Sequence, residues 1–186
     1  MPPVALDSDT SATLQQHYAL ARQTLGAGPA LVVLQLGAQQ CAIAVVTGLQ
    51  ADLLQGLPLG LERTAEQNFK TTPPTPLALE NAITVVEDVV MPLRTSIPGD
   101  TQLFSCDAAV REIAQVCAEP VQPVMVLSLE AVERGFNRFC NVVQGTPAAH
   151  EGLPADNQFA AALLILREFM HHLQFAHITV LENSPA

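Results

Sequence analysis

The sequence predicts an α+β fold dominated by about five helices, with a small antiparallel sheet built on an N-terminal hairpin. Apolar residues recur at helical spacing in several long segments that carry capping signals, whereas the segments with strand character are fewer and shorter. The strands also do not alternate regularly with the helices, which disfavours a parallel doubly wound sheet.

The predicted helices begin and end at recognisable residues. Thr75 and Pro76 are typical of an N-cap and a first helical turn, and Asp107, Ser128 and Asp156 each precede an apolar helical segment. Gly145 lies just past the end of the fourth helix, as a C-terminal stop signal should. The helices are expected over residues 11–25, 76–93, 108–118, 129–143 and 157–172.

Two apolar segments, 30–36 and 41–47, flank the four residues 37–40 and predict an antiparallel hairpin. Shorter strand candidates lie at 101–104, 123–127 and 177–181. The sequence leaves open whether the hairpin and the last strand share one sheet. It favours a single domain over residues 1–186, which could be subdivided into an αββ unit (1–56), a proline-rich loop (57–76) and a helical unit (77–186).

Composition excludes several classes of protein. Hydrophobic residues make up 49% of the chain and charged residues 14%, so the chain has enough apolar surface to fold. The net charge of −10, with Lys70 as the only lysine, argues against binding to nucleic acid or to an anionic membrane surface. We see no signal peptide and no spanning segment, and four cysteines without CxxC spacing suggest reduced thiols, so we expect a cytoplasmic protein.

The histidine-rich segment 167–180 contains the strongest candidate site. On a helix, Glu168 lies within about 60° of both His171 and His172, and Glu-x-x-His is a genuine metal-ligand spacing. Glu168, His171 and His172 are therefore the candidate ligands of a divalent metal. A second Glu-x-x-His, which a di-iron helical bundle would need, is absent from the sequence.

A plainer interpretation of this segment is a solvated helix end. Glu168 lies about half a turn from the apolar stripe of its helix and can form an i,i+4 pair with His172. Leu164 and Ile165 lie on the same side, however, so this face could instead be buried.

Two other groups of residues have simpler interpretations. Glu80, Glu87 and Asp88 could be paired carboxylates, but they fall on one polar arc and are expected to form the solvated face of a helix. Cys106 precedes a helix N-terminus, where a thiolate can be stabilised, yet an ordinary semi-buried thiol is expected. Nucleotide-binding, nucleophile-elbow and HExxH motifs are absent.

Two functional hypotheses follow, and between them the question of enzymatic activity stays open. The first is a non-catalytic domain that self-associates, as a homodimer, or binds a protein or small-molecule partner. Its support is the final helix, which is apolar nearly all round from Phe159 to Leu166. The alternative is a small metal-dependent enzyme or ligand-binding protein that uses the Glu168/His171/His172 cluster, with help from His150, His177 or the acidic arc. No catalytic residue is identified, and no cofactor is required.

Two segments, 79–93 and 106–114, resemble parts of small bacterial proteins, but the resemblance implies no activity.

Overall fold

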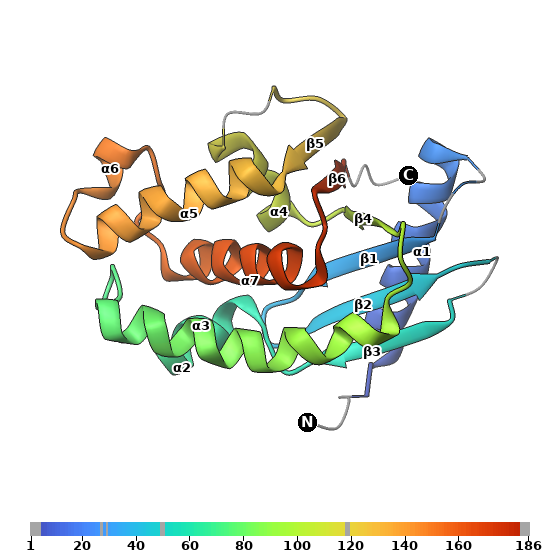
Figure 1. Cartoon of the computed structure of the whole chain (residues 1–186), viewed down its shortest axis with the longest axis horizontal. Coiled ribbons are helices and arrows are strands. Elements are labelled where there is room, and N and C mark those ends of the chain that lie inside the picture. The colour runs from blue at the N-terminus through green and yellow to red at the C-terminus, as the bar shows by residue number, and fades with distance from the viewer. Residues whose placement is uncertain (1–4, 27, 29, 49–50, 118–119, 183–186) are drawn as a thin grey trace.

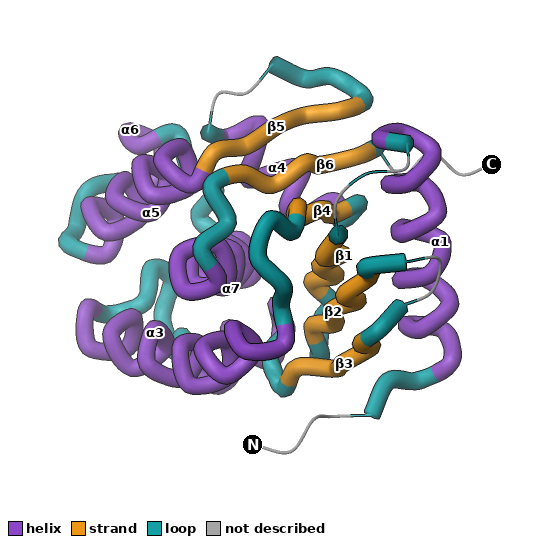
Figure 2. Tube along the Cα trace, turned by 45° about the vertical axis from the view of Figure 1, so that its right-hand side comes forward, coloured by secondary structure: helices purple, strands orange, loops and turns teal. Residues whose placement is uncertain are grey.

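The computed structural model describes residues 5–26, 28, 30–48, 51–117 and 120–182 and is built around one six-stranded sheet. The strands are ordered β3-β2-β1-β4-β6-β5. They comprise β1 (Leu31–Leu36), β2 (Cys41–Val46), β3 (Leu53–Leu57), β4 (Gln102–Ser105), β5 (Val124–Ser128) and β6 (His177–Leu181). The helices are α1 (Ser8–Leu25), α2 (Leu61–Asn68), α3 (Pro76–Val90), the 3₁₀ helix η1 (Met91–Ser96), α4 (Ala108–Val116), α5 (Leu129–Val143), α6 (Ala148–Glu151) and α7 (Asn157–Leu173). Helix α1 covers one face of the sheet, and α3, α5 and α7 lie on the other side (Figures 1 and 2).

The predicted fold class is wrong. In the described part of the chain there are seven α-helices, and the sheet is mixed: β1 pairs with β4, and β4 with β6, in parallel. The proline-rich stretch 57–76 contains helix α2 and is therefore not simply a loop. The predicted end of the third helix, at residue 118, lies outside the described residues, and α4 ends at Val116.

Several local predictions are confirmed. Strands β1 and β2 form the expected antiparallel hairpin, and the last strand runs from His177 to Leu181. The hydroxyls of Thr75 and Ser128 cap α3 and α5 by accepting hydrogen bonds from Ala78 N (3.2 Å) and Ala131 N (3.1 Å). The open question about the sheet is also resolved, because the hairpin and β6 belong to one sheet.

The central strands are buried on both faces because helices cover both sides of the sheet. Along β1, Val32 and Leu34 pack into the large core on the α7 side, whereas Val33 packs with Leu14 of α1 on the other side. A strand covered on both faces needs apolar residues at nearly every position, not in alternation. This is why residues 31–36 and 41–46 are almost uninterrupted in their hydrophobicity.

Helix α7 is the central helix of the larger layer. It packs against α2, α3, α4 and α5 and lies between α3 and α5 in Figure 1. Every residue from Phe159 to Leu166 is buried within this chain. The apolar circumference of the helix is therefore used in intramolecular packing, and it no longer supports the homodimer that the sequence suggested. In the described residues, no helix is both long and apolar enough to cross a membrane.

Helix α2 starts without a side-chain cap because the β1–β2 turn supplies the acceptors. Leu61 N donates to Gly37 O (3.0 Å), and Glu62 N donates to Ala38 O (2.9 Å). Gly60 makes this approach possible. A Cβ at Gly60 would touch Ala38 O and lie 2.5 Å from the backbone carbon of Gln39, which is closer than real Cβ contacts.

We expect Gly60→Ala to lower the free energy of unfolding by about 2–3 kcal/mol, because the added methyl group collides with backbone that cannot move aside. Urea denaturation at 25 °C measures the change. Gly99→Ala is the matched control, since a Cβ at Gly99 meets nothing within 4 Å. Equal stability of the two variants would contradict the close packing of the turn on α2.

Candidate functional site

Asp107 lies where the carboxyl ends of two parallel strands meet a helix. It follows β4, which ends at Ser105, and it is the N-cap residue of α4. Its Oδ2 accepts hydrogen bonds from the backbone N of Leu36, the last residue of β1 (2.6 Å), and from Ser105 Oγ (3.2 Å). The carboxylate thus joins β1 to β4 and does not form the usual side-chain cap on α4. The N-terminal amides of α4 are consequently left for another acceptor.

The surroundings of Asp107 disfavour its charge. Burial raises the pKa of the Asp107 carboxyl, although the hydrogen bond from Leu36 N, the charge of His17 and the Ser105 hydroxyl act in the opposite direction. His17 comes from α1 and is itself buried, and its Nδ1 has no hydrogen-bond partner among the described residues. Burial lowers the pKa of His17, partly offset by Asp107. Asp107 is therefore a carboxyl group whose proton affinity is raised by its site.

A cavity of about 370 Å³ opens beside Asp107. Its wall combines the end of β1 at Leu36, the first residues of α4 (Ala108 and Ala109) and the first turn of α7 with its N-cap Asp156. Ligands of open α/β sheets bind beyond the carboxyl ends of the strands, and helix N-termini bind anions. The acidic side chains of Asp107, Glu112 and Asp156 line the same cavity. Because these carboxylates repel a free anion, an anion is expected to bind in this cavity only together with a cation.

A second polar cluster lies between α3 and α7. His172 Nε2 is 3.1 Å from Glu168 Oε2 and 3.2 Å from Glu87 Oε1. One ligand atom from each of these three residues lies within 4.8 Å of the other two. Glu168 is fully buried, whereas the side chains of His172 and Glu87 are 21% and 34% exposed.

Arg167 and Glu133 extend this cluster toward α5. Arg167 Nη1 donates to Glu168 Oε1 (2.5 Å), and Arg167 Nε donates to Glu133 Oε1 (3.1 Å). His171 Nδ1 lies 3.3 Å from the same Glu133 oxygen. Burial opposes the charge of Arg167, but Glu168 and Glu133 hold the pKa of its guanidinium above the ordinary value.

The structure therefore brings together only part of the predicted metal set. Glu168 and His172 converge, but His171 faces Glu133, and Glu87 from α3 takes its place. The solvated-helix-end interpretation is wrong for Glu168, which is fully buried. Glu87, assigned to a solvated arc, contacts His172. Sequence reasoning placed Glu87 in an acidic arc that could assist the metal site, but it did not pair Glu87 with His172, because 85 residues separate them. It also treated Asp107 only as the start of a helix, although an acidic residue between a strand and a helix is a usable signal.

Cys106 behaves as the expected ordinary thiol. It is buried, and burial together with the neighbouring Asp107 raises its pKa to about 11. A thiol in this state is protonated near neutral pH and is a poor nucleophile.

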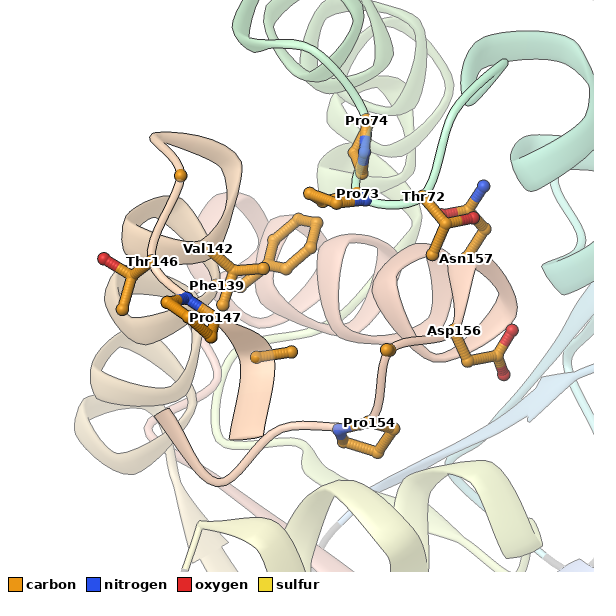
Figure 3. Close-up of a pocket in the computed structure, with 13 residues that line it drawn as sticks. Thr72, Pro73, Pro74, Phe139, Val142, Thr146, Pro147, Pro154, Asp156 and Asn157 are labelled. Atoms are coloured by element: carbon orange, nitrogen blue, oxygen red, sulfur yellow. The ribbon is translucent and has the colours of Figure 1, made fainter. Parts of the chain in front are cut away.

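A second cavity, of about 250 Å³, lies at the other side of the α7 N-terminus (Figure 3). Its walls are mainly apolar, with Pro73 and Pro74 opposite Phe139 and Pro147. In Figure 3 the carboxylate of Asp156 points away from Pro73 and Phe139. This cavity is therefore a mainly apolar hollow with few polar groups that could bind or act on a ligand.

Several solved structures have a similar fold, and among them are a phosphatase and an exopolyphosphatase. The Ppx/GppA phosphatase of Aquifex aeolicus, in its type II crystal structure, superposes with a TM-score of 0.75 at 15% identity, covering 91% of this chain and 58% of that one. An exopolyphosphatase from Cytophaga hutchinsonii gives a TM-score of 0.70 at 14% identity, covering 92% and 59%. No protein-family model and no curated protein matches the sequence. This chain thus has the fold of these proteins and spans less than three fifths of their length.

These comparisons correct the functional expectation. The main hypothesis from the sequence was a non-catalytic, self-associating or partner-binding domain. This hypothesis has lost its structural support, because the apolar face of α7 is buried inside the chain, and two of the structures with a similar fold are described as a phosphatase and an exopolyphosphatase. The findings agree better with the alternative, a small metal-dependent enzyme or ligand-binding protein, than with this main hypothesis.

Proposed function

We propose that this chain is a phosphatase-type domain that hydrolyses phosphoanhydride bonds of a polyphosphate, presented as its divalent-metal complex, at the Asp107 cavity. The observation that carries the proposal is the placement of Asp107 beside the uncapped N-terminus of α4, at the carboxyl ends of β1 and β4. The fold shared with a Ppx/GppA phosphatase and an exopolyphosphatase supports it.

Each part of the cavity has a role in this proposal. The free amides at the start of α4 bind terminal phosphate oxygens, as helix N-termini commonly do. Asp107 accepts a proton from the attacking water, and its raised pKa brings its proton affinity closer to the working pH. The water oxygen bonds to the terminal phosphorus as the bridging P–O bond breaks, which releases orthophosphate and a chain shorter by one unit.

The acidity of the site determines the form of the substrate. Asp107, Glu112 and Asp156 line the cavity, and the chain carries a net charge of −10, so a free polyanion would be repelled. A magnesium complex of the substrate removes most of this repulsion. The four cysteines, which show no CxxC spacing, support a reducing cytoplasmic location for the reaction.

We expect Asp107→Asn to reduce polyphosphate hydrolysis about 100-fold, because the amide keeps an oxygen for the Leu36 N hydrogen bond but cannot take a proton. The assay is release of orthophosphate from polyphosphate in magnesium-containing buffer, repeated with chelator. Burial disfavours the charged form of Asp107, so a neutral amide leaves the free energy of unfolding at pH 8 unchanged or higher. Loss of activity would then not come from unfolding.

The exposed Asp9 of α1 provides the matched control, and Asp9→Asn is expected to retain full activity. The proposal is wrong if the wild-type chain releases no phosphate above background, or if Asp107→Asn is as active as wild type.

A further inference from the structure

The Glu87, Glu168 and His172 cluster has the dimensions of a metal site. Its ligand atoms come from two helices, α3 and α7, and the His172 Nε2 atom is 3.1 and 3.2 Å from the two carboxylates. Zinc binds imidazole nitrogen at about 2.0–2.1 Å and carboxylate oxygen at about 2.0–2.2 Å, so neighbouring ligand atoms of a tetrahedral site are about 3.3 Å apart. The two observed distances would need to open by only a few tenths of an ångström.

The charge of the cluster also favours a divalent cation. Glu87, Glu133 and Glu168 contribute three carboxylates, and Arg167 contributes one guanidinium, which leaves a net charge of −2 when both imidazoles are neutral. Glu168 is completely buried, where uncompensated negative charge is costly. A single divalent cation would neutralise the cluster.

The ligands are held in place by their neighbours. Arg167 binds Glu168 through Oε1, which directs Oε2 toward His172. Hydrogen bonds of this kind orient metal-binding carboxylates in known sites. Glu168 and His172 are one helical turn apart on α7, whose residues around them are packed in the core, so their relative positions are fixed before any ion arrives.

We propose that Glu87, Glu168 and His172 bind one zinc ion between α3 and α7, with water as the fourth ligand. One nitrogen and two oxygen donors plus an open position resemble zinc sites with three protein ligands. Neither phosphate hydrolysis nor the Asp107 cavity enters into this proposal, so it can hold or fail separately from the proposed function. His171 is not a ligand, because its Nδ1 is directed at Glu133.

Zinc titration of the chelator-stripped full chain tests the proposal, with isothermal calorimetry as the readout. We expect one equivalent to bind to wild type, and the melting temperature to rise with zinc concentration because the ion binds the folded state. Glu87→Gln and His172→Ala should each lose this equivalent. Glu87 is partly exposed, so its variant should remain folded even if a change at the buried Glu168 does not.

His171→Ala is the matched control and should still bind one equivalent, since its neighbour His172 supplies the nitrogen. Cobalt(II) distinguishes this cluster from the partly exposed thiols of Cys117 and Cys140, because thiolate ligands add strong near-ultraviolet charge-transfer bands. A visible cobalt spectrum without those bands, lost in Glu87→Gln, supports the site. No binding, binding through thiolates only, or equal loss in His171→Ala would overturn it.

Discussion

Phe169→Ala is expected to lower the free energy of unfolding by about 3–5 kcal/mol, the cost of removing a large aromatic ring from a packed core. Phe169 is completely buried in the larger layer of helices, on α7. Its ring stacks on Phe175 with a centroid separation of 6.1 Å and an interplanar angle of 2°. The truncation would leave a cavity beneath α7. This helix is in contact with α2, α3, α4 and α5.

Urea denaturation followed by far-ultraviolet circular dichroism measures this loss. Leu77→Ala is a suitable control, because Leu77 is 66% exposed on α3 and its truncation should change stability by less than about 0.5 kcal/mol. A loss below about 1 kcal/mol for Phe169→Ala would mean that α7 is not the centre of the core.

Arg167→Met is expected to lower the free energy of unfolding by about 3–5 kcal/mol at pH 8 in the presence of chelator. The change removes the guanidinium that neutralises the fully buried Glu168 and that also binds Glu133. Breaking a buried ion pair is costly mainly because it leaves one charge uncompensated in a medium of low polarity. The methionine keeps much of the apolar contact with Phe136, over which the guanidinium lies at 5.2 Å.

The exposed pair of Arg134 and Glu130 provides the comparison. Their side chains are 61% and 85% exposed, so Arg134→Met should cost less than about 1 kcal/mol. Adding Glu168→Leu to Arg167→Met should restore much of the lost stability, because the uncompensated carboxylate is then gone. Equal effects of Arg167→Met and Arg134→Met, or no recovery in the double variant, would contradict the buried-charge explanation.

Features encoded in short stretches of sequence were predicted well. The caps of α3 and α5 depend on residues three positions apart, and the β1–β2 hairpin depends on two adjacent apolar segments. By contrast, α2 begins with backbone carbonyls of the β1–β2 turn as its acceptors, so it has no side-chain capping signal to find. Strand β3, with Gln55 and Gly56 in its five residues, carries little strand character of its own and is stabilised by pairing with β2.

The candidate sites also contain some residues that the local sequence predicted and others that only tertiary contacts bring into place. Glu168 and His172 were found together because an α-helix places residues four apart on one face. The exchange of His171 for Glu87 was not predictable, since α3 and α7 are distant in the sequence and meet only after the core has formed. Asp107 likewise becomes a site residue only when β1 and β4 pair and bring Leu36 N to its carboxylate, across 71 residues.

By itself, the sequence determined many local elements of this protein: five of the segments that form its helices, where most of those helices start, and that a hairpin opens the sheet. Such features depend on propensity, periodicity and capping within a few residues. The parallel pairing of the sheet, the burial of α7 on every side and the partners of Asp107 and His172 were decided only by the tertiary structure. They depend on contacts between distant segments, whose free energy comes from burying apolar surface in one shared core, and no short stretch of sequence contains that information.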